Sequence, residues 1–255
     1  MKAVFNSFII AFSMYSKIPM PKVSWSKDNM RYVMCFFPLV GTVIGGLVYL
    51  WSKISSSLPF SNVFHTVILI LIPLIITGGI HMDGYLDTLD ALSSYGSKEK
   101  KLEILKDPHT GAFALIHCVI YFFLTYGIWY DVTPDGIFIL SIGFTLSRAL
   151  SGLSVVTFPL GKNTGLVNMF SSESKKKQTG MVMIVYILLC SAFMIYINTV
   201  LGLLAIISAF LVLLYYRYLS IKQFGGITGD LAGYFLQLCE LIMAIIVIMG
   251  DRLWF

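Results

Sequence analysis

The chain has very little charge for its length. Asp, Glu, Lys and Arg make up 12% of its 255 residues, whereas hydrophobic residues make up 57%. A soluble domain usually carries about 25% charged residues. The composition therefore excludes an ordinary soluble protein and predicts an integral membrane protein.

Cysteine is also scarce. The chain has four cysteines, and each stands alone in an apolar stretch, at no spacing typical of a metal or redox site. We expect all four to serve packing only. They are Cys35, Cys118, Cys190 and Cys239.

The first 20 residues lack the small-residue cleavage site of a signal peptide, so we do not expect a cleaved leader. The segment is a short apolar stretch that is closed by Pro19 and Pro21. A further membrane span is the alternative, but the shortness of the stretch favours a helix that lies in the membrane interface.

Long apolar runs are abundant. Seven stretches have close to the ~20 residues that cross a hydrocarbon core of ~30 Å. They are residues 31–51, 63–80, 111–130, 136–160, 180–197, 199–219 and 231–249. Little sequence remains between them, so we expect one all-α polytopic membrane bundle over residues 1–255, with no separate soluble domain.

The basic residues are distributed unevenly among the connections between these spans. If the N-terminus is cytoplasmic and the spans alternate, fifteen of the 18 Lys and Arg residues lie inside. Lys53 and Arg252 then lie outside, and Arg148 lies within a span. By the positive-inside rule, this pattern predicts a multi-pass protein of the cytoplasmic (inner) membrane. Topology thus explains the net charge of +5, and no feature indicates nucleic-acid binding.

Three carboxylates follow the second span within eight residues. Asp83, Asp87 and Asp90 have the spacing i, i+4, i+7, which places them on one face of a helix. A helix N-terminus accommodates one such acid comfortably, but three like charges repel each other. Because Mg²⁺ and Mn²⁺ prefer hard oxygen ligands, the spacing predicts a site for a divalent cation or a substrate.

Two glycine pairs precede acids at the same inner boundary. Gly78–Gly79 leads to Asp83, and Gly225–Gly226 leads to Asp230. Glycine lets bare backbone approach a phosphate group closely. We therefore expect the two segments to be two halves of one site.

Other polar residues each allow two interpretations. Arg148 lies in an apolar span and needs an anionic partner, either a buried carboxylate or a substrate phosphate. His81 stands two residues before Asp83 and is either a general base or a metal ligand. Glu103 and Asp107 either pair with neighbouring lysines or belong to the site.

Gly78–Asp90 and Leu102–Asp107 together match two patterns of one enzyme family. The patterns are G-G-x-H-x-D-G-x-x-D-T-x-D-G and L-E-I-M-K-D-S-x-x-G. They are typical of the cobalamin synthase family, adenosylcobinamide-GDP ribazoletransferase, which this chain resembles. Shorter similarities extend over most of the chain, at Lys17–Pro21, Phe37–Gly41, Arg148, Gly165–Phe170 and Gly225–Gly233.

The chain departs from the family patterns at four positions. Ala91 and Ala114 stand where the family has Gly, and Pro108 stands where it has Ser. Gln237 replaces a Glu, and because Gln brings no charge, a metal role for this position is in doubt. Glu240 and the three aspartates of the first motif keep their places.

The resemblance implies the last joining step of the corrinoid nucleotide loop. A hydroxyl group of α-ribazole, or of its 5′-phosphate, attacks the diphosphate of adenosylcobinamide-GDP. GMP leaves, and adenosylcobalamin or its phosphate forms, with Mg²⁺ required. A homo-oligomer, and association with other enzymes of the corrinoid pathway, are left open.

Phosphoryl transfer of this kind depends on metal ions, cations and rigid positioning, and we assign the site residues accordingly. The expected Mg²⁺ ligands are carboxylates, namely Asp83, Asp87, Asp90, Asp107 and Asp230. The expected phosphate-binding cations are Arg148 and Lys162, and His81 is expected to accept the ribazole proton. The remaining substrate contacts are expected at Gly78, Gly79, Gly225, Gly226 and Thr228.

Three alternatives share part of the pattern. A CDP-alcohol phosphotransferase typically shows D-G-x-x-A-R, but no Ala-Arg follows Asp83–Gly84 here. An aromatic prenyltransferase usually carries N-D-x-x-D, whereas His81 precedes the acids here. An ion-coupled transporter would need polar residues across the whole membrane, and only Arg148 and Glu240 lie clearly within spans. These features favour the ribazoletransferase.

Overall fold

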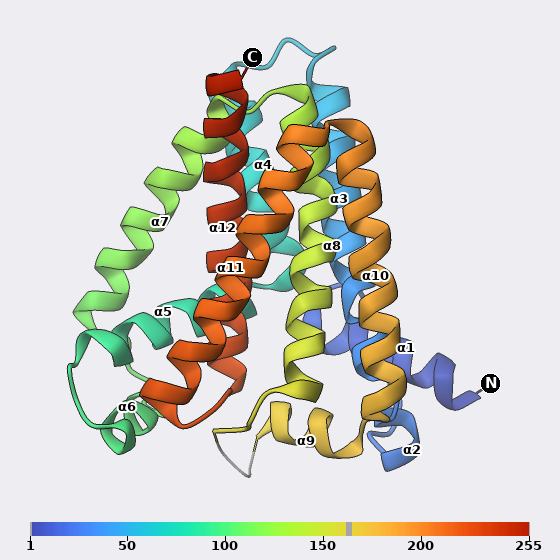
Figure 1. The fold of residues 1–255 in the computed structure, drawn as a ribbon, viewed down its shortest axis with the longest axis vertical. Helices are drawn as coiled ribbons and strands as arrows, with labels where there is room; N and C mark the ends of the chain where they lie inside the picture. Colours follow the sequence, from blue (N-terminus) through green and yellow to red (C-terminus); the bar gives the residue numbers. More distant parts are fainter. Residues whose placement is uncertain (1, 162–164, 255) are drawn as a thin grey trace.

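The computed structural model describes residues 2–161 and 165–254, which form twelve helices and no strand. The long helices stand side by side in a bundle (Figure 1). Six of those described are long and apolar enough to cross a membrane. They are α3 (Val33–Ser55), α7 (Ala112–Tyr130), α8 (Pro134–Thr157), α10 (Lys176–Ile197), α11 (Thr199–Phe224) and α12 (Gly229–Trp254). This confirms the polytopic helix bundle.

The second predicted span is interrupted. α4 (Asn62–Thr77) is followed by α5 (Ile80–Ser93), and the axes of the two helices differ by 93°. α4 descends through the bundle, whereas α5 lies across one end of it (Figure 1). The break falls at Gly78 and Gly79, whose φ angles of +64° and +79° favour glycine. The prediction of a span over 63–80 was therefore three residues too long, and the aspartates lie on a separate helix.

Four short helices complete the fold. They are α1 (Lys2–Tyr15), α2 (Lys27–Met30), α6 (Lys98–Ile104) and α9 (Leu166–Glu173). α2, α5, α6 and α9 lie at the same end of the bundle, which we call the basic end (Figure 1). α1 also lies toward this end, and it is apolar but too short to be a candidate span. Its Phe5 is 63% exposed, which suits the predicted interfacial helix.

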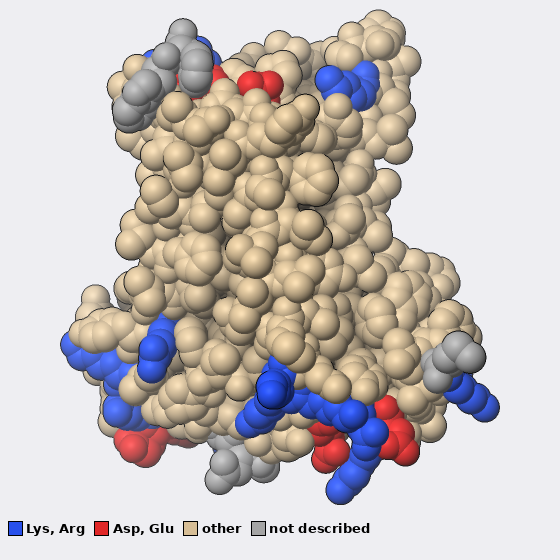
Figure 2. Space-filling view, turned by 45° about the vertical axis from the view of Figure 1, so that its right-hand side comes forward, with Lys and Arg blue, Asp and Glu red and all other residues tan. Residues whose placement is uncertain are grey.

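Charge gathers at the basic end. Figure 2 shows Lys and Arg side chains concentrated there, with an uncharged band above them on the face in view. An uncharged band between polar ends is the surface that a bilayer requires. The chain is therefore a multi-pass membrane protein.

Two connections at the basic end are joined by their backbones. The Gly161 N–H donates a hydrogen bond to the Ile227 carbonyl oxygen over 2.9 Å, and the Ile227 N–H donates to the Pro159 carbonyl oxygen over 2.9 Å. These bonds attach the segment after α8 to the segment before α12. The start of α12 is thereby held in place beside the end of α8.

Candidate active site

The three clustered aspartates lie on α5, a helix that is continuous over Ile80–Ser93. The predicted helical spacing is therefore present. Asp83 is exposed, and Asp87 and Asp90 are partly exposed, so none of them is sealed in the protein interior. These carboxylates can be reached by a charged ligand from the basic end.

α5 crosses the start of α12 at two glycines. A Cβ atom added to Gly84 would lie 2.7 Å from the Asp230 carbonyl oxygen, and one added to Gly233 would lie 2.9 Å from the His81 carbonyl oxygen. Only the absence of both side chains lets the two backbones approach this closely. The crossing brings Asp230 to Asp83 and Asp87, so the two predicted halves of the site do meet.

Gly84→Ala is expected to separate these helices. The added methyl group would press on the backbone of α12 rather than on a movable side chain, and such overpacking typically costs about 1–3 kcal/mol. We expect a lower free energy of unfolding and a larger relative loss of turnover, because Asp230 would shift away from α5. Gly127→Ala on α7 is the matched control, since a Cβ there meets no atom within 4 Å. Equal effects of the two variants would contradict the proposed role of the crossing.

The aspartates perturb one another. The pKa of Asp87 is raised to about 6, first by partial burial and then by the negative charges of Asp83, Asp230 and Asp90. Desolvation and like charges both disfavour an ionised carboxylate. The site therefore concentrates negative charge that a bound cation would neutralise.

The carboxylate oxygens at this site are suited to a Mg²⁺ ion that is also bound by a phosphate group of a ligand. Among the described residues, no three His, Cys, Asp or Glu side chains are arranged so that together they could hold a metal ion. Mg²⁺ is usually bound by one or two carboxylates, several waters and substrate phosphates, rather than by a cage made of protein alone. One or two carboxylates of the group Asp83, Asp87 and Asp230 would therefore suit Mg²⁺ that a phosphate ligand also binds.

Asp90 and Asp107 have other neighbours. The carboxylate of Asp90 lies so close to Gly111, just before α7, that a Cβ at Gly111 would collide with it. Asp107 accepts a hydrogen bond from the His109 backbone N–H over 3.0 Å and lies 2.7 Å from the His109 ring Nδ1. These contacts hold the pKa of Asp107 below its usual value. The predicted metal roles of both residues remain predictions.

Glu103 pairs with Lys100 over 3.1 Å. Of the two interpretations that the sequence allowed for Glu103, the structure thus shows pairing with a neighbouring lysine.

A cavity of about 140 Å³ opens beside the carboxylates of Asp83 and Asp230. Its wall is built by side chains from α1, α3, α5, α8, α9 and α12. His81 lines this cavity and is only 4% exposed, and its Nε2 atom has no hydrogen-bond partner among the described residues. Tyr15 and Phe37 flank its ring at centroid distances of 6.2 and 5.9 Å. The site is thus polar at the aspartates and aromatic beside them.

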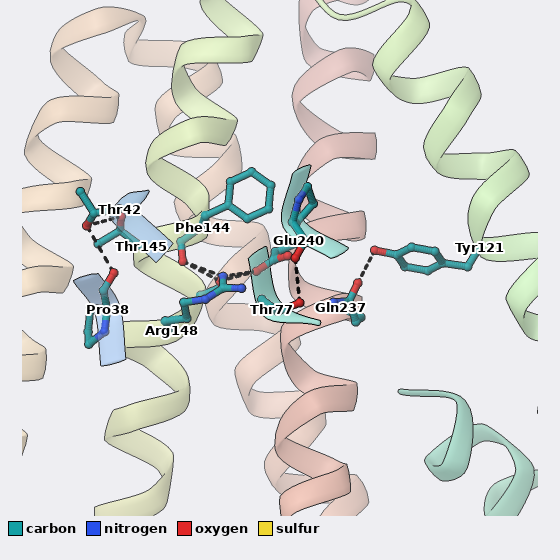
Figure 3. Close-up of polar contacts among 11 residues, drawn as sticks. Pro38, Thr42, Thr77, Tyr121, Phe144, Thr145, Arg148, Gln237 and Glu240 are labelled. Carbon is teal, nitrogen blue, oxygen red and sulfur yellow. Dashed lines mark hydrogen bonds and ion pairs between the residues drawn. The ribbon is translucent and has the colours of Figure 1, made fainter. Parts of the chain in front are cut away.

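Arg148 has a protein partner in the bundle interior. It is 1% exposed, and its Nη1 donates hydrogen bonds to Glu240 Oε1 over 2.6 Å and to the Phe144 carbonyl oxygen over 2.9 Å (Figure 3). The Ser147 hydroxyl donates to the same Glu240 oxygen over 2.8 Å. The sequence allowed either a buried carboxylate or a substrate phosphate as the partner of Arg148. The structure shows a buried carboxylate, that of Glu240. The predicted role of Arg148 on substrate phosphate remains a prediction.

Gln237 is also engaged within the bundle. The Tyr121 hydroxyl donates to Gln237 Oε1 over 2.5 Å, from α7 to α12 (Figure 3). Neither Tyr121 nor Ser147 was among the predicted site residues. Their partners lie 116 and 93 residues away along the chain, so no local pattern indicates them.

The remaining predicted contacts surround the start of α12. Thr228 is buried, and its hydroxyl accepts a hydrogen bond from the Leu231 N–H over 3.3 Å, so it caps α12. Gly225 ends α11 with a φ of +79°, and Gly226 has a φ of +152°. The predicted phosphate ligand Lys162 lies outside the described residues. Substrate contacts at the other positions remain predictions.

Comparison with known proteins agrees with these features. The family model described as cobalamin-5-phosphate synthase matches residues 7–248. An adenosylcobinamide-GDP ribazoletransferase of Lachnoclostridium phytofermentans is 46% identical over 246 residues, which cover 96% of this chain and 94% of that protein. Two others, from Clostridium botulinum and Clostridium perfringens, are 33% identical (95% of this chain, 96% of the relative) and 31% identical (94% and 96%). No solved structure matches the chain.

The family match over residues 7–248 includes α5, most of α12 and the segments between them, and the relatives are matched over nearly the whole length of both chains. They therefore confirm the resemblance that the motifs indicated. The chain belongs to the cobalamin-5-phosphate synthase family, and it is a membrane transferase of the kind that assembles the nucleotide loop.

Proposed function

We propose that the protein joins α-ribazole, or α-ribazole 5′-phosphate, to adenosylcobinamide-GDP by Mg²⁺-dependent phosphoryl transfer at the cytoplasmic face of the membrane. The observation that carries this proposal is the crossing of α5 and α12, which places Asp230 beside Asp83 and Asp87. The family and its relatives support the nucleotide-loop reaction. The metal and the membrane face are our inference.

In the proposed reaction, a hydroxyl oxygen of the ribazole attacks the phosphorus that is bonded to the corrinoid side chain. A new P–O bond forms, the bridging P–O bond of the diphosphate breaks, and GMP leaves with the bridging oxygen. The hydroxyl proton passes to water, which reaches the site at the exposed Asp83. Asp83, Asp87 and Asp230 would hold Mg²⁺, which supplies positive charge to the phosphate oxygens.

The helix starts at the site support phosphate binding. The N-cap position of α5 is Gly79, and no side chain caps its first N–H groups. α12 also begins here, at Gly229. The N-terminus of a helix favours an anion through its free N–H groups and its dipole. The backbone at these two starts is therefore suited to orient the diphosphate beside the aspartates.

The direct test is turnover in detergent or liposomes. Purified protein is supplied with adenosylcobinamide-GDP and α-ribazole, and GMP and cobalamin are measured with and without Mg²⁺. We expect equal amounts of both products, and only when Mg²⁺ is present. Product formation that is unchanged in the presence of excess chelator would overturn the metal dependence. A folded sample that releases no GMP would overturn the reaction itself.

We further propose that the basic end faces the cytoplasm, because 14 of the 17 Lys and Arg residues that the structure describes lie in segments that meet there. Lys98 at the basic end and Ser57 at the opposite end are both exposed. In right-side-out vesicles, a membrane-impermeant thiol reagent is expected to label Ser57→Cys and to spare Lys98→Cys. The unsubstituted chain measures background from the native cysteines. The reverse labelling pattern would contradict the orientation.

A further inference from the structure

We propose that the cavity beside Asp83 and Asp230 binds the heteroaromatic base of the attacking nucleoside, and that His81 donates a hydrogen bond to the free ring nitrogen of that base. The inference rests on the proposed function, since it concerns how α-ribazole is held. It assigns His81 to substrate recognition rather than to proton transfer.

The cavity has the size and chemistry for an aromatic ring. Its volume is about 140 Å³, and an apolar cavity of roughly 150 Å³ is known to hold benzene. Most of its wall is apolar, with Met14, Met34, Val155 and Leu236 among the lining residues. The benzene-sized part of dimethylbenzimidazole fits this space, and the rest of the base would extend toward the opening beside the aspartates. Guanine would leave several polar groups unpaired in the same space, which is costly.

One polar atom in the wall lacks a partner. His81 Nε2 is buried and forms no hydrogen bond with the described residues. A neutral imidazole can donate from one nitrogen, and a buried donor without an acceptor is destabilising. In α-ribazole, one nitrogen of the base carries the ribose and the other has a free lone pair. That lone pair can supply the acceptor that Nε2 lacks, once the imidazole ring turns its buried Nε2 toward the cavity.

The position of the cavity links recognition to the reaction. His81 and Asp83 lie two residues apart on α5, and Asp83 and Asp230 line the same cavity. A base held in the cavity therefore places its ribose at the aspartates, where the diphosphate is proposed to lie. The rings of Tyr15 and Phe37 lie beside the ring of His81. α5 thus has two roles in this proposal: His81 recognises the base, and Asp83 lies where the ribose hydroxyl would be positioned.

The test compares α-ribazole with the same nucleoside in which a C–H group replaces the free ring nitrogen, a dimethylindole riboside. Wild-type protein is expected to have a KM about ten-fold or more lower for α-ribazole. In His81→Phe, which keeps an aromatic ring, the KM for α-ribazole should rise to that of the indole riboside. The KM and kcat for the indole riboside should hardly change. His117→Phe on α7 is the matched control, because within the described part of the chain the His117 ring bonds only the Phe113 carbonyl oxygen on its own helix.

Other outcomes overturn the inference. If His81 is a general base, His81→Phe lowers kcat equally for both nucleosides. If His81 only supports the fold, both KM values rise by the same factor. Calorimetric binding of α-ribazole without the corrinoid substrate separates this inference from the proposed function. Binding that weakens about ten-fold in His81→Phe supports the inference even if no GMP forms, and unchanged binding refutes it.

A second variant tests the cavity itself. Ala232 lines it from α12, and Ala232→Leu would occupy part of its volume. We expect the KM for α-ribazole to rise several-fold more than the KM for an imidazole riboside, which lacks the fused ring. An equal change for the two nucleosides would show that the base lies elsewhere.

Discussion

Replacing Asp83 or Asp230 by Asn is expected to lower Mg²⁺-dependent turnover by roughly 10²–10³-fold, the usual effect of removing one group that stabilises charge in a transition state. Both substitutions keep the size of the side chain but remove its charge. Asp83 is exposed, so its loss should leave the fold intact. The Mg²⁺ concentration needed for half-maximal activity should rise in both variants, because each loses one carboxylate ligand.

Asp28→Asn is the matched control for these variants. Asp28 lies at the same end of the bundle and pairs with Arg31 over 3.1 Å, but it is not among the groups that raise the pKa of Asp87. Turnover and thermal stability should be measured in the same detergent for all three proteins. An Asp83→Asn enzyme with full Mg²⁺-dependent turnover would refute the central role of this cluster.

Arg148→Met is expected to destabilise the protein by about 3–5 kcal/mol, the usual cost of leaving a buried charge unpaired. Arg148 is 1% exposed, and its partner Glu240 has a side chain that is 9% exposed. Removing the guanidinium leaves the Glu240 carboxylate inside the bundle, with the Ser147 hydroxyl as its only hydrogen-bond partner among the described contacts. The double variant Arg148→Met/Glu240→Leu removes both charges and is expected to recover most of the loss.

The shift in thermal midpoint in detergent measures this effect, with wild type and both variants heated at one rate. Arg31→Met is the matched control, because its pair with Asp28 is exposed and is expected to contribute within about 1 kcal/mol. A double variant as unstable as Arg148→Met would show that the pair does more than balance charge. Turnover of the stable double variant then tests the predicted role of Arg148: full activity would exclude a necessary contact with substrate phosphate.

The sequence by itself determined the spans and the acidic helix. Apolar length and helical spacing are local properties, so the predicted spans agree with the helices to within a few residues at most ends. The spans at 199–219 and 231–249 are exceptions, because α12 continues to Trp254, and α11 continues to Phe224 and ends only at the positive φ of Gly225. The spacing of Asp83, Asp87 and Asp90 likewise required no knowledge of packing. The family followed from these motifs.

The tertiary structure decided which distant residues meet. The contact of Gly84 with Asp230 joins segments that are more than 140 residues apart, and it depends on two backbones with no side chain between them. The pairing of Arg148 with Glu240 and the aromatic surroundings of His81 arise in the same way, from helices that pack together. Periodicity describes one helix at a time, whereas a site between helices is set by how closely their surfaces fit.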